Sequence, residues 1–200
     1  GDTVTINWQG EARPASIPLA WLYQCAVGDL CRPELQMRRW LQAAALAPQR
    51  DFAVLSFAEL GSDAAARLNW LTRLLQDGIG FLRGVPQREH AILEACAHIG
   101  YVPETNYGRV FDVRAVPQPE NLAYSDLGLG LHTDNPYREP VPGFQALHTL
   151  VAAPDGGDSL FADGWALAEQ LCATNPGAFQ ILSHTPVPFL YQAAGADLYA

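Results

Sequence analysis

The feature that most constrains the fold is a change of sequence pattern near residue 109. Before it, apolar residues recur at helical spacing, as in Leu68, Leu71 and Leu75. After it, prolines and glycines separate short segments of β-type composition, which read RVFDVRAV, NLAYS, LGLGLHTD, GFQALHTLVA and GDSLFAD. Helices followed by a series of short strands predict an α+β protein. We expect its strands to form a double-stranded β-helix, or jelly roll, with flanking helices.

Local signals mark the ends of several helices. Ser62 is a predicted N-cap, and Gly78 lies just past the end of the same helix. Asn175 is a second predicted N-cap, with Pro176 in the first turn. The predicted helices cover residues 33–46, 62–77, 86–99, 164–173 and 175–183, and further strands are predicted at residues 3–8 and 79–84.

The chain is long enough for one sizeable domain and a small appendage, since 49% of its 200 residues are hydrophobic. Residues 1–47 are predicted to form a small N-terminal unit, itself partial, with too little apolar surface for a large core. Residues 48–200 are predicted to form the N-terminal part of a jelly-roll domain.

The charged residues of the chain limit the classes of partner and cofactor that it can bind. A formal charge of −9 argues against nucleic acid, which requires a clustered basic surface, and is compatible with a small cationic substrate. All twelve basic residues are arginine, which excludes a Schiff-base lysine, a pyridoxal phosphate site and a Walker A lysine within these residues. No apolar run approaches the ~18 residues of a membrane span. We expect a cytoplasmic protein without a membrane partner, and leave a homodimer open.

The cysteines do not form a zinc-binding pattern. Cys25 and Cys31 are separated by five residues, and no second ligand pair accompanies them. Cys96 and Cys172 lie among apolar residues of predicted helices, where small buried side chains are expected. The sequence therefore argues against a zinc site in this chain.

The most informative short motif is the H-x-D pair His132 and Asp134. In a strand, residues two apart point to the same side, so the imidazole and the carboxylate would converge. Two histidines and a carboxylate on one face are what non-haem Fe(II) oxygenases use. By itself the pair is weak, because a polar strand end with a surface aspartate gives the same letters.

The surrounding motifs make the pattern specific. An HTD strand is followed by PG-x-Q-x-LH, by GGDS and by NP-x-AF-x-IL, at residues 132–134, 142–148, 156–159 and 175–182. In this order the motifs resemble the taurine-dioxygenase superfamily, and most closely its γ-butyrobetaine dioxygenase branch. The resemblance covers most of the chain between residues 4 and 189. It implies a jelly-roll oxygenase that uses Fe(II), 2-oxoglutarate and O2.

The resemblance also assigns expected roles to single residues. His132 and Asp134 match the first two iron ligands and are the expected catalytic residues. Aromatic faces attract quaternary ammonium groups, so an aromatic cage is chemically reasonable, although ordinary sheet packing would place aromatics in the same way. The expected 2-oxoglutarate-binding residues are Ser159, Leu147 and Asn121, and the expected cage residues are Tyr107, Phe111 and Tyr124.

The chain also departs from the family pattern. Asn135 follows Asp134 where the animal enzyme has a tyrosine, so the expected cage has one aromatic ring fewer. The distal histidine ligand and the arginine that pairs with 2-oxoglutarate lie beyond residue 200 in relatives, so we expect a fragment that is inactive alone. A structural zinc cluster of the family would lie upstream of the first residue. The other four histidines are interpreted as structural, namely His90, His98, His148 and His184.

The resemblance thus implies a dioxygenase that hydroxylates a small trimethylammonium acid such as γ-butyrobetaine, a reaction of carnitine biosynthesis. A trimethylammonium phosphonate or a sulfonate is an alternative substrate for the same chemistry. Two readings from other classes stay open: a non-catalytic jelly-roll binding module and a hydrolase that uses another metal on the same two side chains.

Overall fold

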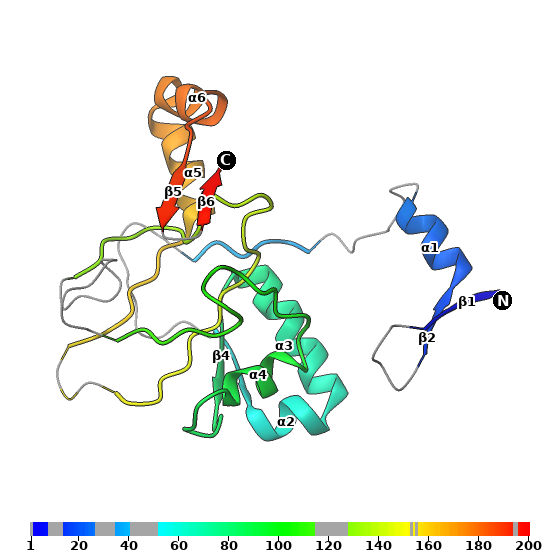
Figure 1. The fold of residues 1–200 in the computed structure, drawn as a ribbon. Helices are drawn as coiled ribbons and strands as arrows, with labels where there is room; N and C mark the ends of the chain where they lie inside the picture. Colours follow the sequence, from blue (N-terminus) through cyan, green and yellow to red (C-terminus); the bar gives the residue numbers. More distant parts are fainter. Residues whose placement is uncertain are drawn as a thin grey trace. The chain divides into compact units, whose positions relative to one another are not determined.

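A computed structural model describes residues 2–7, 14–26, 35–40, 52–114, 128–152, 154, 156–193 and 196–200 (Figure 1). The chain divides into two compact units, Gly1–Gln36 and Met37–Ala200, and each is considered by itself. The boundary predicted near residue 47 falls among residues 41–51, which lie outside this description, so it stays a prediction.

The first unit is a β-hairpin followed by a helix. Strand β1 (Thr3–Ile6) pairs antiparallel with β2 (Ala15–Pro18), with Val4 opposite Ile17. This confirms the strand predicted from the alternating sequence at its start. Helix α1 (Leu19–Ala26) follows β2 directly and contains no buried residue. Among its described residues, the unit has no core of its own.

The second unit begins with a β-α-α-β arrangement. Strand β3 (Ala53–Ser56) and strand β4 (Gly80–Arg83) are parallel, and helices α2 (Phe57–Ser62) and α3 (Ala64–Asp77) connect them. Parallel neighbours need a crossover connection of about a dozen residues or more, which these helices provide. The structure confirms the strand predicted at residues 79–84. It adds β3, which the sequence reasoning did not predict.

Side-chain caps fix the ends of the two crossover helices. Ser56 and Glu59 form a reciprocal capping box at the start of α2. Asp63 caps α3 by accepting hydrogen bonds from the amides of its first turn, so the N-cap predicted at Ser62 was wrong by one residue. Ser62 instead ends α2 and bonds back to the Ala58 carbonyl. The predicted C-terminal glycine is confirmed, because Gly78 adopts the left-handed conformation with φ of 73°.

The core of the second unit lies between α2, α3 and the β3–β4 pair. Trp70 is its largest member, and its indole N–H lies 3.2 Å from the carbonyl oxygens of both Ala53 and Phe81, one on each strand. Leu60 is completely buried beside it. Gly80 leaves room for the indole, because a Cβ there would lie 3.1 Å from the Trp70 ring. The buried cluster consists of Ala53, Leu55, Leu60, Trp70 and Ala95.

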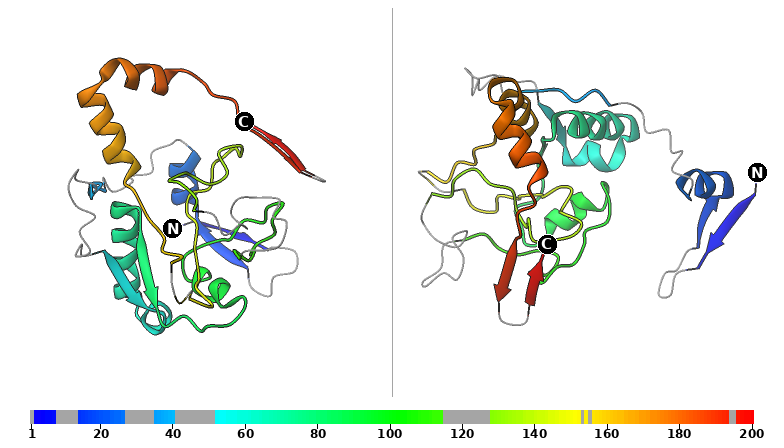
Figure 2. Two further views of the ribbon diagram at one scale, coloured as in Figure 1. Left: turned by 90° about the vertical axis from the view of Figure 1, so that its left-hand side faces the viewer. Right: turned by 90° about the horizontal axis from the view of Figure 1, so that it is seen from above.

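Later helices match the sequence prediction to different degrees. Helix α5 (Gly164–Thr174) and helix α6 (Pro176–His184) are confirmed, and the chain turns sharply between them at Asn175, which caps α6 (Figure 2). Helix α4 (Ala91–Cys96) is shorter than predicted, because His90 before it has φ of 63° and cannot continue a right-handed helix. The described chain ends in the antiparallel strands β5 (Leu190–Ala193) and β6 (Ala196–Tyr199).

The strands predicted after residue 109 are absent from residues 109–114, 128–152 and 156–163 of the structure. These residues hold loops, and the described part of the chain contains three two-stranded sheets and no closed barrel. Strands are stabilised by hydrogen-bonded neighbours, and no strand pairs with these segments here. Their apolar side chains are accordingly exposed, with Leu131 at 68% and Leu147 at 62%. The mixed α and β composition is confirmed, whereas the jelly roll stays a prediction.

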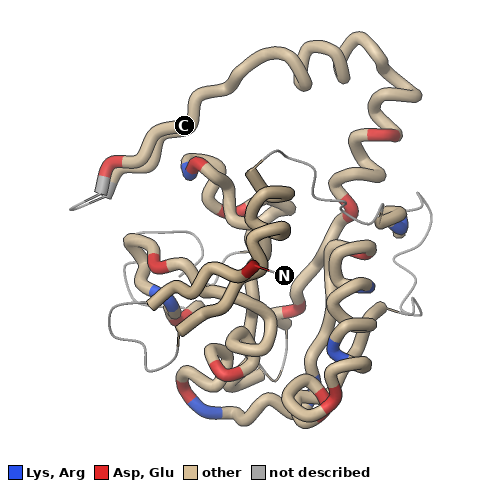
Figure 3. Tube along the Cα trace, turned by 90° about the vertical axis from the view of Figure 1, so that its right-hand side faces the viewer, with Lys and Arg blue, Asp and Glu red and all other residues tan. Residues whose placement is uncertain are grey.

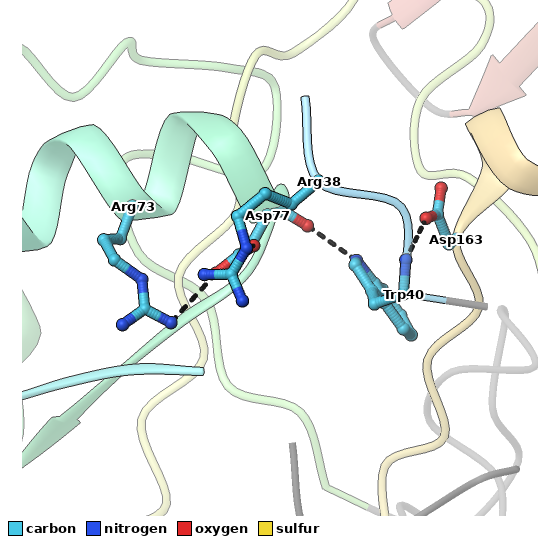
Figure 4. A network of polar contacts seen from close by, with 5 residues as sticks. All are labelled: Arg38, Trp40, Arg73, Asp77 and Asp163. Carbon is cyan, nitrogen blue, oxygen red and sulfur yellow. Dashed lines mark hydrogen bonds and ion pairs between the residues drawn. The ribbon is translucent and has the colours of Figure 1, made fainter. Parts of the chain in front are cut away.

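The segment 37–40 is extended, so the helix predicted at residues 33–46 was wrong over its described part. The backbone N–H of Arg38 donates to the Gln76 carbonyl at 2.9 Å. The backbone N–H of Trp40 donates to the Asp163 carboxylate at 2.9 Å, and its indole N–H donates to the Asp77 carbonyl at 2.7 Å (Figure 4). A helix would need these backbone N–H groups for its own ladder, so the contacts with α3 and α5 override the local preference.

Two arginines neutralise the buried carboxylate of Asp77 at the end of α3. Arg38 approaches it at 3.5 Å from the extended segment, and Arg73 approaches at 3.6 Å from one turn earlier in α3 (Figure 4). The Asp77 side chain is only 3% exposed, so an unpaired charge there would be costly. Elsewhere along the described trace, basic and acidic residues are interspersed (Figure 3). Among the described helices, none is both long and apolar enough to cross a membrane.

Candidate metal centre and the aromatic cluster beside it

The structure places the side chains of His132 and Asp134 next to each other. The His132 Nε2 atom lies 3.1 Å from the Asp134 Oδ1 atom, and the two side chains are 47% and 40% exposed. No strand is present at these residues, so the pair meets through the local path of a loop. Both side chains remain accessible to a ligand from solvent.

The hydrogen bonding of His132 determines which of its ring nitrogens faces Asp134 as an acceptor. Its Nδ1 atom lies 2.7 Å from the Gly130 carbonyl oxygen, which can only accept, so Nδ1 carries a proton. In a neutral imidazole the Nε2 atom then carries no proton and can only accept a hydrogen bond. This atom faces the Asp134 carboxylate. Two acceptors at 3.1 Å require a proton or a cation between them. An outer N–H that donates to a backbone carbonyl is also how metal-binding histidines are usually oriented.

This donor set fits a divalent metal in part. Imidazole and carboxylate suit iron, and a 2-His-1-carboxylate site needs one more histidine. Across the described ranges, no group of three histidine, cysteine or acidic side chains converges. His132 and Asp134 together are one side chain short of such a site, and the role of each as an iron ligand stays a prediction.

Asn135 organises the loop that follows the pair. Its φ is 54°, a left-handed conformation that asparagine tolerates better than most residues. Its side-chain oxygen accepts hydrogen bonds from the Tyr137 hydroxyl at 2.8 Å and from Arg138 Nε at 3.2 Å. The sequence singled out Asn135 only as a missing cage residue. The structure makes it the acceptor that holds Tyr137 and Arg138 together.

Four aromatic rings gather beside this loop and form what we call the aromatic cluster: Tyr107, Phe111, Tyr137 and Tyr191. The centroids of Tyr107 and Phe111 lie 5.6 Å apart. Tyr191 meets Tyr107 edge-on at 5.9 Å and stacks on Tyr137 at 4.8 Å. Separations of 4.5–7 Å are those of favourable aromatic pairs. The cluster joins three distant parts of the chain.

The hydroxyl groups of the aromatic cluster form an ordered chain. Tyr137 uses its only proton to donate to Asn135, so in the 3.1 Å contact between Tyr107 and Tyr137 the donor is Tyr107. Desolvation by burial, together with the hydrogen bond to Tyr137, raises the pKa of the Tyr107 phenol. Tyr107 therefore stays neutral at physiological pH and contributes no negative charge to the cluster.

The remaining predicted site residues are not gathered in the same way. Ser159 lies on an exposed loop, and Leu147 is 62% exposed. Asn121 and Tyr124 fall within residues 115–127, outside the described residues. Their predicted roles stay predictions. His184 on α6 bonds to the Gln180 carbonyl at 3.0 Å, as a local helix contact.

Sequence reasoning missed Tyr137, Arg138 and Tyr191. The first two follow Asp134 within four residues, so proximity in sequence could have indicated them. No local signal marks Tyr191, because it reaches the aromatic cluster only through the tertiary path of β5.

Comparison with known proteins decides the family. The family model described as taurine catabolism dioxygenase TauD, TfdA family, matches residues 42–197. The chain belongs to the TauD/TfdA family. The TauD/TfdA match spans the aromatic cluster and the His132–Asp134 pair alike, so the resemblance seen in the motifs is confirmed.

Individual relatives place this TauD/TfdA chain in the γ-butyrobetaine dioxygenase-like branch. It is 38% identical to a γ-butyrobetaine dioxygenase from Pseudomonas sp. (strain AK-1) over 76% of the chain and 38% of that protein. Identity to the human γ-butyrobetaine dioxygenase is 29% over 93% of the chain and 48% of that protein. Identity to the human mitochondrial trimethyllysine dioxygenase is 32% over 61% of the chain and 29% of that protein. The chain thus spans less than half the length of these curated relatives.

Proposed function

We propose that the protein is an Fe(II)- and 2-oxoglutarate-dependent dioxygenase that hydroxylates a small trimethylammonium substrate such as γ-butyrobetaine. The observation that carries the proposal is the paired His132 and Asp134, whose facing acceptor atoms can share a bound cation. Relatives named for γ-butyrobetaine and for trimethyllysine support the substrate class. The proposal includes a jelly roll for the intact protein, as the family implies.

The chain's own side chains have distinct parts in this proposal. His132 and Asp134 would hold the metal, and the Gly130 carbonyl would keep the His132 ring in the orientation that frees Nε2. When bound, iron with 2-oxoglutarate supplies the activation of dioxygen that amino-acid side chains cannot provide. The aromatic cluster would hold the quaternary ammonium group and exclude water around it. Tyr124, outside the described residues, is proposed as a further member.

A quaternary ammonium group suits these rings for a physical reason. It cannot donate hydrogen bonds, so it loses less hydration than a primary amine when it enters aromatic surroundings, and the ring faces attract its charge. Tyr107 and Phe111 lie at the separation at which two rings can contact one methylated nitrogen. Neutral Tyr107 adds its quadrupole to this attraction.

The proposal is tested by removing the metal ligands from the intact protein. His132→Ala and Asp134→Ala should each lower the bound iron content and abolish succinate formation, because the affinity for the metal falls when one of its ligands is removed. Both side chains are about half exposed, so the free energy of unfolding of the metal-free protein should change little. His184→Ala is the matched control, since it removes an exposed histidine far along the chain. Turnover at the wild-type rate in either ligand variant would refute the assignment.

A sulfonate or a phosphonate is the alternative substrate. The description of the matching family model names taurine, which is a sulfonate, and this supports the alternative. A comparison of γ-butyrobetaine with its phosphonate and sulfonate counterparts separates these substrates. Iron binding without any succinate formation would favour a binding module, and turnover without dioxygen would favour a hydrolase.

A further inference from the structure

We propose that Arg138 binds the anionic end of the substrate and thereby selects zwitterions over simple quaternary ammonium ions. The inference deepens the proposed function and rests on it for the location of the substrate. It adds a residue with a specificity role to the aromatic cluster.

Arg138 lies at the edge of the aromatic cluster in a fixed orientation. Its guanidinium carbon is 5.7 Å from the centroid of the Tyr137 ring, above that ring. Its Nε atom donates to the Asn135 side chain at 3.2 Å, and a terminal nitrogen donates to the Asn106 side chain. Tyr137 also stacks on Tyr191, with the two ring centroids 4.8 Å apart.

The charge of Arg138 is not compensated within the described residues. Its two hydrogen-bond partners are neutral amides, and no described carboxylate forms an ion pair with it. By contrast, Arg38 and Arg73 both pair with Asp77, and Arg88 pairs with Glu94. A guanidinium has five N–H donors, and these two bonds leave three of them for a ligand.

This combination determines the kind of ligand that fits. The rings attract a methylated cation, whereas the oriented guanidinium repels it and attracts an oxyanion. A ligand with both charges satisfies both groups, and its anionic end can meet the guanidinium in the two-pronged geometry that arginine favours. A bare quaternary ammonium ion gains only the ring contacts and is repelled by the guanidinium. We therefore expect the anion to be required for tight binding.

The decisive variant is Arg138→Gln in the intact protein, with Arg109→Gln as the matched control. Arg109 is exposed, lies two residues from Tyr107 and has no hydrogen bond or ion pair in the described part of the chain. Binding of γ-butyrobetaine and of its methyl ester to the metal-free protein is measured by calorimetry, and KM and kcat are measured with iron and 2-oxoglutarate present. The ester keeps the trimethylammonium group and lacks the negative charge.

Arg138→Gln should weaken γ-butyrobetaine binding and raise KM by about 10- to 100-fold, as expected for the loss of a hydrogen bond between charged groups. It should leave ester binding within about twofold or tighten it, because a repelling charge is removed. Arg138→Lys should recover part of the affinity for γ-butyrobetaine, since lysine keeps the positive charge but lacks the two-pronged donor geometry of arginine. Arg109→Gln should match the wild type with both ligands.

Two results would overturn the inference. Equal weakening of acid and ester by Arg138→Gln would mean that Arg138 only maintains the loop, and unchanged binding of the acid would mean that it does not contact the substrate. The carboxylate, phosphonate and sulfonate compounds are compared by the same calorimetry to identify the anion. Wild-type protein that binds these zwitterions without hydroxylating them contradicts the proposed function, while the effect of the variant still decides the role of Arg138. Absence of all binding contradicts both.

Discussion

Replacing Asp163 should destabilise the second unit more than its position in a loop suggests. Its Oδ1 atom accepts from the Ala166 amide at 3.0 Å and caps α5, and its Oδ2 atom accepts from the Trp40 amide at 2.9 Å. Asp163 is only 6% exposed, so water cannot readily replace it. Loss of the cap costs about 0.5–2 kcal/mol, and loss of a charged hydrogen bond costs about 1.5–3 kcal/mol. Asp163→Ala should therefore lower the free energy of unfolding by about 2–4 kcal/mol, allowing for partial overlap of these effects.

Urea unfolding of the intact protein measures this difference through the midpoint at a constant m-value. Asp163→Asn should lose roughly half as much, because the amide keeps one acceptor and presents a donor to the other N–H. Asp158→Ala is the control, as it removes an exposed carboxylate five residues earlier in the same loop. A loss below about 0.5 kcal/mol for Asp163→Ala, or an equal loss for Asp158→Ala, would refute the argument, since that is the range of ordinary surface changes.

Two further predictions concern the region of the core. Gly80→Ala should lower the free energy of unfolding by about 1–3 kcal/mol, because the added Cβ would lie 3.1 Å from the Trp70 ring and crowd it. Gly100→Ala is the control and should cost less, because no atom lies within 4 Å of the Cβ that it adds. Equal melting temperatures for the two variants would contradict this prediction. Burial raises the pKa of the Cys96 thiol, so Cys96 should react several-fold more slowly with iodoacetamide at pH 8 than exposed Cys172, as followed by mass spectrometry. Equal labelling rates would show that the Cys96 thiol is not protected.

Features that depend on neighbouring residues could be predicted from the sequence. The start of α6 at Asn175 and the end of α3 at Gly78 depend on side chains and dihedral angles within one turn. The same holds for the approach of His132 to Asp134, which needed a spacing of only two residues, although the prediction assumed a strand and the structure has a loop. In these cases the relevant interaction is local, so the sequence pattern contains it.

Features that depend on distant partners could not be predicted. Segment 37–40 has helical composition, yet its N–H groups bond to residues near positions 76 and 163. Tyr191 and Tyr107 are far apart in sequence, and nothing in either segment indicates that the rings meet. The segments after residue 109 were predicted as strands from their composition, but their described parts are loops. Composition does not supply the partner strand that a strand needs. For the same reason the predicted roles of Ser159 and Leu147 remain untested.

The link between Trp40 and Asp163 also bears on the order in which the chain folds. It joins residues 123 positions apart, whereas the Trp70–Ala53 hydrogen bond in the core joins residues 17 apart. Loop closure becomes more costly with the logarithm of length, and the difference between these two loops is about 1.8 kcal/mol. The β3-to-β4 region can thus assemble from nearby contacts at an early stage. The Trp40–Asp163 contact closes a far longer loop, which places it late in folding and makes it an early point of opening when the native state fluctuates.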